Sequence, residues 1–255
     1  MSSPVFTYHN AVYPSISPSL PSLNCKGKTV VVTGGSRGIG RAIFHNFITA
    51  GANVFIIGRS EASLRQAATE LDETAKARVG YQAADVNDQE AVKAAFMNTV
   101  EKFGGIDILV NNVGYTDKMQ PVSSFDLEDY WRCYEVNVKG GLIVLQEFLK
   151  LAKPKATLIN ISSKTSIGMY GTLSAYSSSK LAFAKICEFA QAEIPDLREF
   201  NVHPGTVNTD GAKKLVPDMK AVDDISTSYP VPGRVEKANG LGRSSRCLLR
   251  VACER

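Results

Sequence analysis

The chain has 255 residues, of which 44% are hydrophobic, and its 29 basic and 25 acidic side chains give a formal net charge of +4. This ordinary globular composition excludes disordered, collagen-like and coiled-coil proteins, and the length fits one α/β domain. So small a net charge does not indicate binding to nucleic acid or to a membrane surface.

The sequence shows no membrane segment and no metal-binding motif. No stretch approaches the roughly 18 consecutive apolar residues of a transmembrane helix, and residues 1–10 lack the features of a secretory signal, so we expect a cytoplasmic protein. The five cysteines include no CxxC pair and the three histidines are far apart. We therefore expect reduced thiols and no bound metal.

The chain divides into three zones. Residues 1–26 hold four prolines among many serines, and we expect an extended arm there because proline fixes φ and lacks an N–H. Residues 27–210 alternate between short β-branched runs and longer stretches with helical spacing, which predicts a single α/β domain. Residues 211–255 break this rhythm.

The alternation in the middle zone predicts a doubly wound, Rossmann-like parallel sheet. Near-continuous apolar strands need helices on both faces, and right-handed crossovers place a ligand at the carboxyl ends of the strands. The expected strands cover residues 29–33, 53–57, 78–83, 106–110, 156–161 and 200–203, and the expected helices cover residues 38–50, 61–77, 88–103, 126–151 and 175–194.

A glycine-rich turn follows the first expected strand. Gly34 permits the tight turn, Gly38 lets the backbone approach a pyrophosphate, and Gly40 allows helix and strand to pack closely. The spacing G-x-x-x-G-x-G is one residue wider than the usual dinucleotide fingerprint. We expect this turn, with Ser36 and Ile39, to bind a dinucleotide; the alternative is a glycine-rich turn that holds no nucleotide.

The end of the second expected strand indicates which dinucleotide. A carboxylate there would bind the ribose 2′-hydroxyl of NAD, whereas basic side chains would accept the 2′-phosphate of NADP. The strand ends at Ile57 and is followed by Gly58-Arg59-Ser60, and Arg37 lies in the glycine-rich turn opposite. Two guanidinium groups favour NADP(H). The alternative is that both arginines are solvated surface residues.

Four polar residues form a candidate catalytic group. Tyr176 and Lys180 are four residues apart at the start of an expected helix, so both side chains lie on one face. Ser163 follows the fifth expected strand, and its neighbour Ser162 is the alternative at that position. Asn137 falls inside another expected helix.

With these residues in view, the chain resembles the short-chain dehydrogenase/reductase family. The proline-rich arm is also similar to a fungal branch of that family. Val113 stands where the family has alanine. The motifs occur in family order: Thr33-Gly34-x-x-x-Gly38-x-Gly40, Asn111-Asn112-Val113-Gly114, Asn137, Ser163, Tyr176-x-x-x-Lys180 and Pro204-Gly205-x-x-x-Thr209.

The resemblance implies interconversion of a carbonyl and a secondary alcohol, with a fungal secondary metabolite or a polyol as the expected substrate. Tyr176 would exchange a proton with the substrate oxygen, and Lys180 would lower its pKa and bind the nicotinamide ribose. Ser163 would hydrogen-bond the substrate oxygen, and Asn137 would hold a proton-relay water. The alternative for each residue is a packing or solvated role.

The resemblance also implies the rest of the cofactor site. Asp85 and Val86 would meet the adenine, unless Asp85 is only an acid at a helix N-terminus. Asn111 and Gly114 would line the adenosine ribose side. The loop after the sixth strand would contact the nicotinamide, although Thr209 could be only a turn hydroxyl; it comprises Pro204, Gly205, Val207 and Thr209.

Subunit contacts and the substrate pocket are implied in the same way. The fourth helix pairs subunits in many relatives, so we expect a homo-oligomer, a dimer or a tetramer, and Trp131 and Cys133 are predicted to be packing residues. Residues 115–122 and 210–230 would line the substrate pocket. We expect no nucleic-acid or membrane partner.

Residues 211–255 depart from the family after the substrate loop. Residues 231–255 carry six basic and two acidic side chains, so the whole net charge of +4 lies there. Our hypothesis is a truncated or frame-shifted end, which a transcript reading through all 255 codons would contradict. The rival to an active enzyme is thus a nucleotide-binding Rossmann protein without catalysis, or an inactive truncated member.

Overall fold

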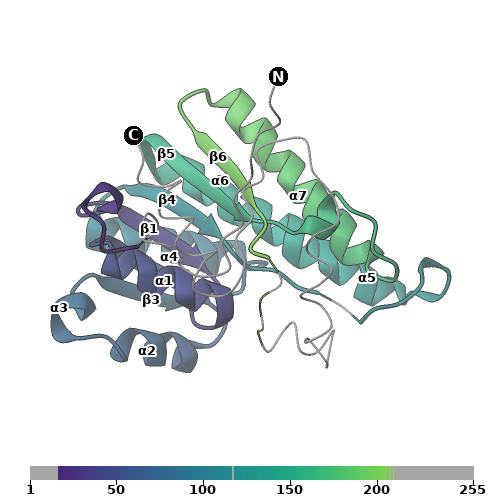
Figure 1. Cartoon of the computed structure of the whole chain (residues 1–255), viewed down its shortest axis with the longest axis horizontal. Coiled ribbons are helices and arrows are strands. Elements are labelled where there is room, and N and C mark those ends of the chain that lie inside the picture. Colours follow the sequence, from purple (N-terminus) through teal and green to yellow (C-terminus); the bar gives the residue numbers. More distant parts are fainter. Residues whose placement is uncertain (1–16, 117, 206, 208, 210–255) are drawn as a thin grey trace, which may run out of the picture.

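A parallel sheet forms the centre of the computed structural model, which describes residues 17–116, 118–205, 207 and 209 (Figure 1). The six strands follow the order β3-β2-β1-β4-β5-β6, and every pairing is parallel. This confirms the predicted doubly wound sheet. The strands are β1 (Thr29–Thr33), β2 (Asn53–Gly58), β3 (Val79–Ala83), β4 (Ile106–Asn111), β5 (Ala152–Ile161) and β6 (Arg198–Val202).

Helices connect the strands and lie on both faces of the sheet (Figure 1). They are α1 (Gly38–Thr49), α2 (Glu61–Thr69), α3 (Glu73–Lys76), α4 (Gln89–Phe103), α5 (Leu127–Tyr134), α6 (Gly141–Leu151) and α7 (Ser174–Glu193). The 3₁₀ turns are η2 (Pro21–Leu23), η3 (Val122–Ser124) and η5 (Lys164–Ser166), and η4 (Glu135–Gly140) is a π-helical segment.

Two expected helices are divided in the structure. The helix predicted over residues 61–77 becomes α2 and α3, because Asp72 accepts a hydrogen bond from the Ala75 N–H and begins a new helix. The helix predicted over residues 126–151 is interrupted by the π-helical segment η4. Strand β5 also begins at Ala152, earlier than expected, and pairs there with Ile106 of β4.

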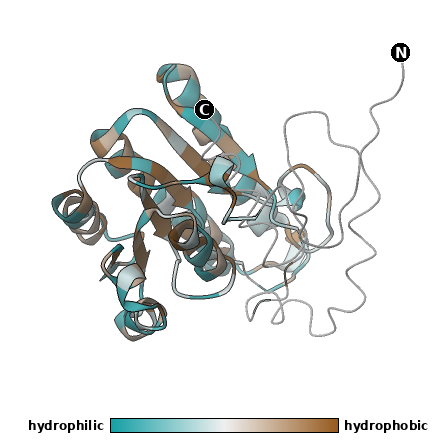
Figure 2. Ribbon diagram, turned by 60° about the vertical axis from the view of Figure 1, so that its left-hand side comes forward, coloured by the Kyte–Doolittle hydropathy of each residue, from teal (hydrophilic) through white to brown (hydrophobic). Residues whose placement is uncertain are grey.

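The sheet separates two apolar clusters. Val30 and Val32 of β1 point to one side, where Phe44 and Phe47 of α1 cover them. Side chains on the other side include Val31 of the same strand, in a cluster with residues of α4, α6 and α7. All five residues of β1 are buried, and the three central ones are valines, because both faces of this central strand are covered. The hydrophobic colouring gathers on the strands and on the helix faces in the interior (Figure 2).

The ends of the chain lie largely outside the described residues. Of the predicted arm, only residues 17–26 are described, and Leu23 and Cys25 there are buried. Cys133 and Cys187 are buried thiols, whereas Cys25 is disulfide-bonded, so the expectation of reduced thiols is wrong for Cys25. The atypical segment 211–255 is outside the described part. Within that part, no helix is long and apolar enough to cross a bilayer.

Candidate active site

The glycine-rich turn after β1 forms a backbone cradle at the start of α1. Gly34 and Gly38 have φ values of 65° and 54°, which glycine adopts without strain. A Cβ on Gly40 would lie 2.1 Å from the Gly34 carbonyl oxygen, so only glycine fits there. The Arg37 side chain does not cap the helix, and the first turn presents its N–H groups to an anion. The cradle therefore fits a dinucleotide pyrophosphate.

Thr33 and Asn112 join this turn to the loop after β4. The Thr33 hydroxyl oxygen accepts hydrogen bonds from the backbone N–H of Asn112 at 3.0 Å and of Val113 at 3.2 Å. In return, Asn112 Nδ2 donates to the carbonyl oxygens of Thr33 and Gly34. Both residues stand in the motifs of the sequence, but no role for either was predicted. The available signal was a polar residue at the end of a buried strand.

The predicted NADP-binding arginines flank the same cradle. Arg37 and Arg59 are both exposed. Their loops are close, because a Cβ on Gly58 would lie 3.8 Å from Ser36 Oγ. On the opposite side, a Cβ on Gly38 would lie 3.3 Å from the Thr209 side chain. The structure thus brings the ends of β2 and β6 to the glycine-rich turn.

The remaining predicted cofactor residues also lie at the carboxyl edge of the sheet. Asp85 is exposed and accepts a hydrogen bond from the Asn87 N–H, while Asp88 is the residue that caps α4. Asp85 lies shortly before α4, and both its proposed contact with adenine and the alternative, an acid at a helix N-terminus, stay predictions. Asn111 is buried and accepts a hydrogen bond from the Thr33 hydroxyl. Ile39, Val86, Gly114, Pro204, Gly205 and Val207 occupy the same edge, and Val86 and Val207 are buried.

Asn137 is buried in the π-helical segment η4 and holds the backbone of the loop after β4. Its Oδ1 accepts from the Tyr115 N–H at 2.7 Å, and its Nδ2 donates to the Tyr115 carbonyl oxygen at 2.9 Å. The second amide hydrogen goes to Ser179 Oγ at 2.9 Å. Both N–H hydrogens are thus used inside the protein. π-helical segments often mark functional sites.

Lys180 is buried between the loops after β4 and β5. Its ammonium group donates to the carbonyl oxygen of Ile161 at 3.0 Å and to that of Val113 at 3.4 Å. A Cβ on Gly114 would lie 3.0 Å from Lys180 Nζ, so glycine makes room for the ammonium group. Burial lowers the pKa of Lys180 to about 8, because removal from water disfavours the charged form.

Ser163, at the end of β5, shares a hydrogen bond with Tyr176 of α7. Its neighbour Ser162 instead places its hydroxyl near Ser166. Burial raises the pKa of Tyr176, and the hydrogen bond with Ser163 opposes that rise. The expected lowering of the Tyr176 pKa by Lys180 is not found, since burial dominates and the ammonium group is directed at backbone carbonyls.

His203 joins the loops after β5 and β6. Its Nδ1 accepts a hydrogen bond from the Lys164 N–H at 3.0 Å, directly beside Ser163. Sequence reasoning gave His203 no role, because nothing in the local sequence shows that the ends of β5 and β6 are adjacent. The sheet register supplies that information, pairing Ile161 with Val202.

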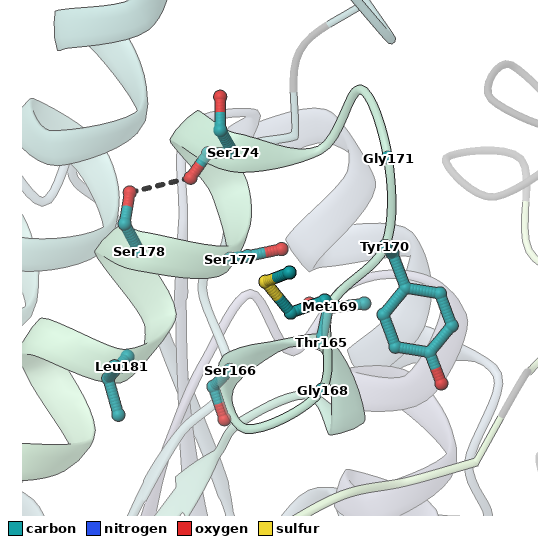
Figure 3. A pocket seen from close by; sticks show the side chains of 10 residues that line it. All are labelled: Thr165, Ser166, Gly168, Met169, Tyr170, Gly171, Ser174, Ser177, Ser178 and Leu181. Atoms are coloured by element: carbon teal, nitrogen blue, oxygen red, sulfur yellow. Dashed lines mark hydrogen bonds between the residues drawn. The ribbon is translucent and has the colours of Figure 1, made fainter. Parts of the chain in front are cut away.

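A cavity of about 350 Å³ lies between the loop after β5 and the first turns of α7 (Figure 3). At 100° per residue, Ser177, Ser178 and Leu181 lie on a different face of α7 from Tyr176 and Lys180. None of residues 115–122 lines this cavity, and residues 210–230 of the predicted substrate pocket lie outside the described residues. Its walls are Thr165, Ser166, Gly168, Met169, Tyr170, Gly171, Ser174, Ser177, Ser178 and Leu181.

Comparison with known proteins agrees with this arrangement. A family model described as short chain dehydrogenase matches residues 28–220. The chain belongs to the short chain dehydrogenase family. Members are oxidoreductases that use NAD or NADP and act on small molecules, which confirms the resemblance seen in the sequence.

The curated relatives include fungal members of this short chain dehydrogenase family. The short chain dehydrogenase mpl6 of Monascus purpureus is 35% identical over 228 residues, which cover 84% of this chain and 75% of that protein. The short chain dehydrogenase tazN of Aspergillus terreus is 35% identical over 225 residues, covering 84% of this chain and 49% of tazN. The chain therefore spans about half the length of tazN.

Solved structures of short chain dehydrogenases share the fold. The KRED1-Pglu enzyme aligns with a TM-score of 0.74 and 29% identity, covering 88% of this chain and 94% of that one. A dehydrogenase/reductase from Sinorhizobium meliloti 1021 aligns with a TM-score of 0.80 and 25% identity, covering 95% and 93% of the two chains.

Proposed function

We propose that the protein is an NADP(H)-dependent oxidoreductase that interconverts a carbonyl and a secondary alcohol on a small molecule. The observation that carries the proposal is the grouping of Ser163, Tyr176 and Lys180 where β5 ends and α7 begins. Lys180 is buried with its ammonium group on the Ile161 carbonyl oxygen, and the Ser163 side chain acts on the pKa of Tyr176. The substrate is proposed to be a secondary metabolite or a polyol, which is what the resemblance to the fungal branch of the family implies.

The cofactor is proposed to lie along the carboxyl edge of the sheet. The first turn of α1 would hold the pyrophosphate, with Arg37 and Arg59 on the 2′-phosphate. When bound, the nicotinamide supplies or accepts a hydride. Asp85 and Val86 are proposed for the adenine, and Asn111 and Gly114 for the adenosine ribose side. Pro204, Gly205, Val207 and Thr209 are proposed to contact the nicotinamide.

Tyr176 is proposed as the general acid and base. In the direction of reduction, its phenol donates a proton to the carbonyl oxygen and becomes a phenolate. Ser163 donates a hydrogen bond where negative charge develops, which stabilises the alkoxide and the phenolate alike. Lys180 is proposed to bind the nicotinamide ribose and, with a pKa of about 8, to return a proton toward Tyr176 near neutral pH.

Asn137 is proposed to hold the loop after β4 in place for Lys180. Because both hydrogens of its amide group are bound within the protein, a proton-relay water at this side chain must use the remaining lone pair of Oδ1. The relay through Asn137 stays a prediction. A cytoplasmic location likewise stays a prediction of the sequence.

We also propose a homo-oligomer joined through α5 and α7, which pack against each other. Leu127 and Trp131 of α5 and Leu181 and Phe189 of α7 are each at least half exposed. The predicted packing residue Cys133 is buried in the monomer, whereas Trp131 is 59% exposed and contacts the Tyr134 ring. Trp131 would then pack against a second subunit.

The test separates binding from chemistry. Fluorescence titration is expected to show tighter binding of NADPH than of NADH. Arg37→Ala and Arg59→Ala should each weaken NADPH binding about tenfold, which corresponds to the loss of one charge-assisted contact, and leave NADH binding unchanged. The exposed Arg65 of α2 serves as the control, and Arg65→Ala should change neither titration. Equal affinity for the two cofactors would contradict the choice of NADP(H).

Turnover is then measured against a panel of ketones and polyols. Tyr176→Phe should keep cofactor binding and lose about 10³-fold or more in kcat, because the transferred proton has no donor. Cofactor binding without turnover on any compound, unchanged by Tyr176→Phe, would favour the rival, a nucleotide-binding protein without catalysis.

A further inference from the structure

Thr165 makes a double contact with Ser163, which caps the 3₁₀ turn η5. It lies in the 3₁₀ turn η5, two residues after Ser163. The Thr165 hydroxyl donates to Ser163 Oγ at 2.9 Å, and the Thr165 backbone N–H donates to the same oxygen at 3.2 Å. Ser163 also shares a hydrogen bond with Tyr176. Ser163 Oγ therefore accepts two hydrogen bonds from Thr165 and also interacts with the Tyr176 phenol.

The number of donors and acceptors on a hydroxyl group decides whether Ser163 donates to Tyr176 or accepts from it. A serine hydroxyl has two acceptor lone pairs and one proton to donate. The two hydrogen bonds from Thr165 use both lone pairs. The proton of Ser163 is then left to be donated to the Tyr176 oxygen, or to a substrate oxygen beside it. Without the Thr165 hydroxyl, one lone pair is released and Ser163 can instead accept a hydrogen bond from the Tyr176 phenol.

We propose that Thr165 is a positioning residue that makes Ser163 a hydrogen-bond donor toward Tyr176 and the substrate oxygen. This inference rests on the proposed function and adds to it, since a donating Ser163 stabilises the phenolate and an accepting Ser163 stabilises the phenol. The Thr165 hydroxyl is proposed to influence proton transfer through Ser163, because both hydrogen bonds that Thr165 donates go to Ser163 Oγ.

The surroundings of Thr165 allow the hydroxyl to be removed cleanly. Thr165 is half-buried and lines the cavity between η5 and α7 (Figure 3). Valine has nearly the same shape as threonine and lacks only the hydroxyl. The adjoining cavity leaves space for small adjustments, and the backbone bond from the residue 165 N–H is kept. Thr165→Val therefore isolates the hydroxyl, and Thr165→Ser restores it.

The test measures the pH dependence of alcohol oxidation, in which Tyr176 must be a phenolate. Thr165→Val is expected to move the Tyr176 inflection of kcat/KM to higher pH by about half to one unit, so that rates below the inflection fall about three- to tenfold. Thr165→Ser should restore the wild-type profile. Ser178→Ala is the control, because Ser178 lines the same cavity and bonds within α7. NADPH binding should stay unchanged in all three variants.

A double-mutant cycle with Ser163→Ala tests the route of the effect. In that background Thr165→Val should cause no further shift, because the residue through which it acts is missing. An unchanged pH profile in folded Thr165→Val, or a full additional shift in the Ser163→Ala background, would overturn this inference alone. Turnover that survives Tyr176→Phe would overturn the proposed function and the inference together.

Discussion

Lys180 is a buried cation whose described partners are two backbone carbonyl oxygens. Burial costs free energy for the charged form, and this is why its pKa falls from 10.5 to about 8. Well below pH 8 the group is protonated in both the folded and the unfolded chain. Between pH 8 and pH 10.5 the unfolded chain binds more protons, so the free energy of unfolding rises with pH.

Lys180→Met should remove this pH dependence. From the pKa values of 8 and 10.5, wild-type stability gains about 2 kcal/mol from this group between pH 8 and pH 10, and the variant lacks that gain. Urea unfolding at the two pH values measures the difference. Lys185→Met, at an exposed lysine on the same helix, should keep the wild-type slope. Equal slopes in wild type and Lys180→Met would contradict the buried charge.

The sequence predicted the four catalytic candidates but not what holds them. The spacing of Tyr176 and Lys180 follows from helix geometry alone, so it could be read locally. The contacts of Asn137 join positions 22 and 42 residues apart in the chain, and no local pattern indicates such pairs. Thr165 gave no signal either, because a threonine next to serines is typical of many turns.

At the scale of elements, the junction of β1 and α1 depends on close approach of two backbones. A Cβ at position 40 would collide with the Gly34 carbonyl oxygen, which cannot rotate away as a side chain can. Strand, turn and helix were all predictable here because glycines and apolar residues mark them. The π-helical segment η4 could not be predicted in this way. It contains Asn137, whose contacts with Tyr115 and Ser179 are distant in the sequence.

Gly40→Ala should destabilise the protein by about 2 kcal/mol or more and abolish cofactor binding, because the helix must move away from the strand. Thermal unfolding and NADPH titration measure the two effects. Gly171→Ala is the matched control, since a Cβ there meets no atom within 4 Å. A variant at position 40 with wild-type stability would show that the turn adjusts freely.

At the scale of the whole molecule, the face formed by α5 and α7 is where a second subunit is proposed to bind. Exposed apolar side chains on two packed helices are costly in water and mark interaction surfaces when they are contiguous. The fold class could be predicted from the alternation of strands and helices. The exposure of Trp131 could not be predicted from the sequence, because an aromatic residue in an amphipathic helix can equally belong to the hydrophobic core.

Leu181→Glu should lower the molar mass of the assembly toward that of the monomer, because a carboxylate would be buried between subunits without a partner. Light scattering coupled to size exclusion gives the mass. Met97→Glu, at a methionine of α4 that is 52% exposed, should leave the assembly intact. A wild-type chain that is monomeric at all concentrations would contradict the proposed interface.

The contacts described for the catalytic cluster have one consequence for separating cofactor binding from proton transfer. Every hydrogen bond given above for Asn137, Ser163 and Lys180 joins residues between Val113 and Lys180. The residues proposed for proton transfer thus hold one another through contacts within a single continuous part of the chain, whereas the turn proposed to bind the cofactor lies outside it. A substitution in that turn should therefore weaken cofactor binding and leave the contacts of Asn137 and Lys180 intact.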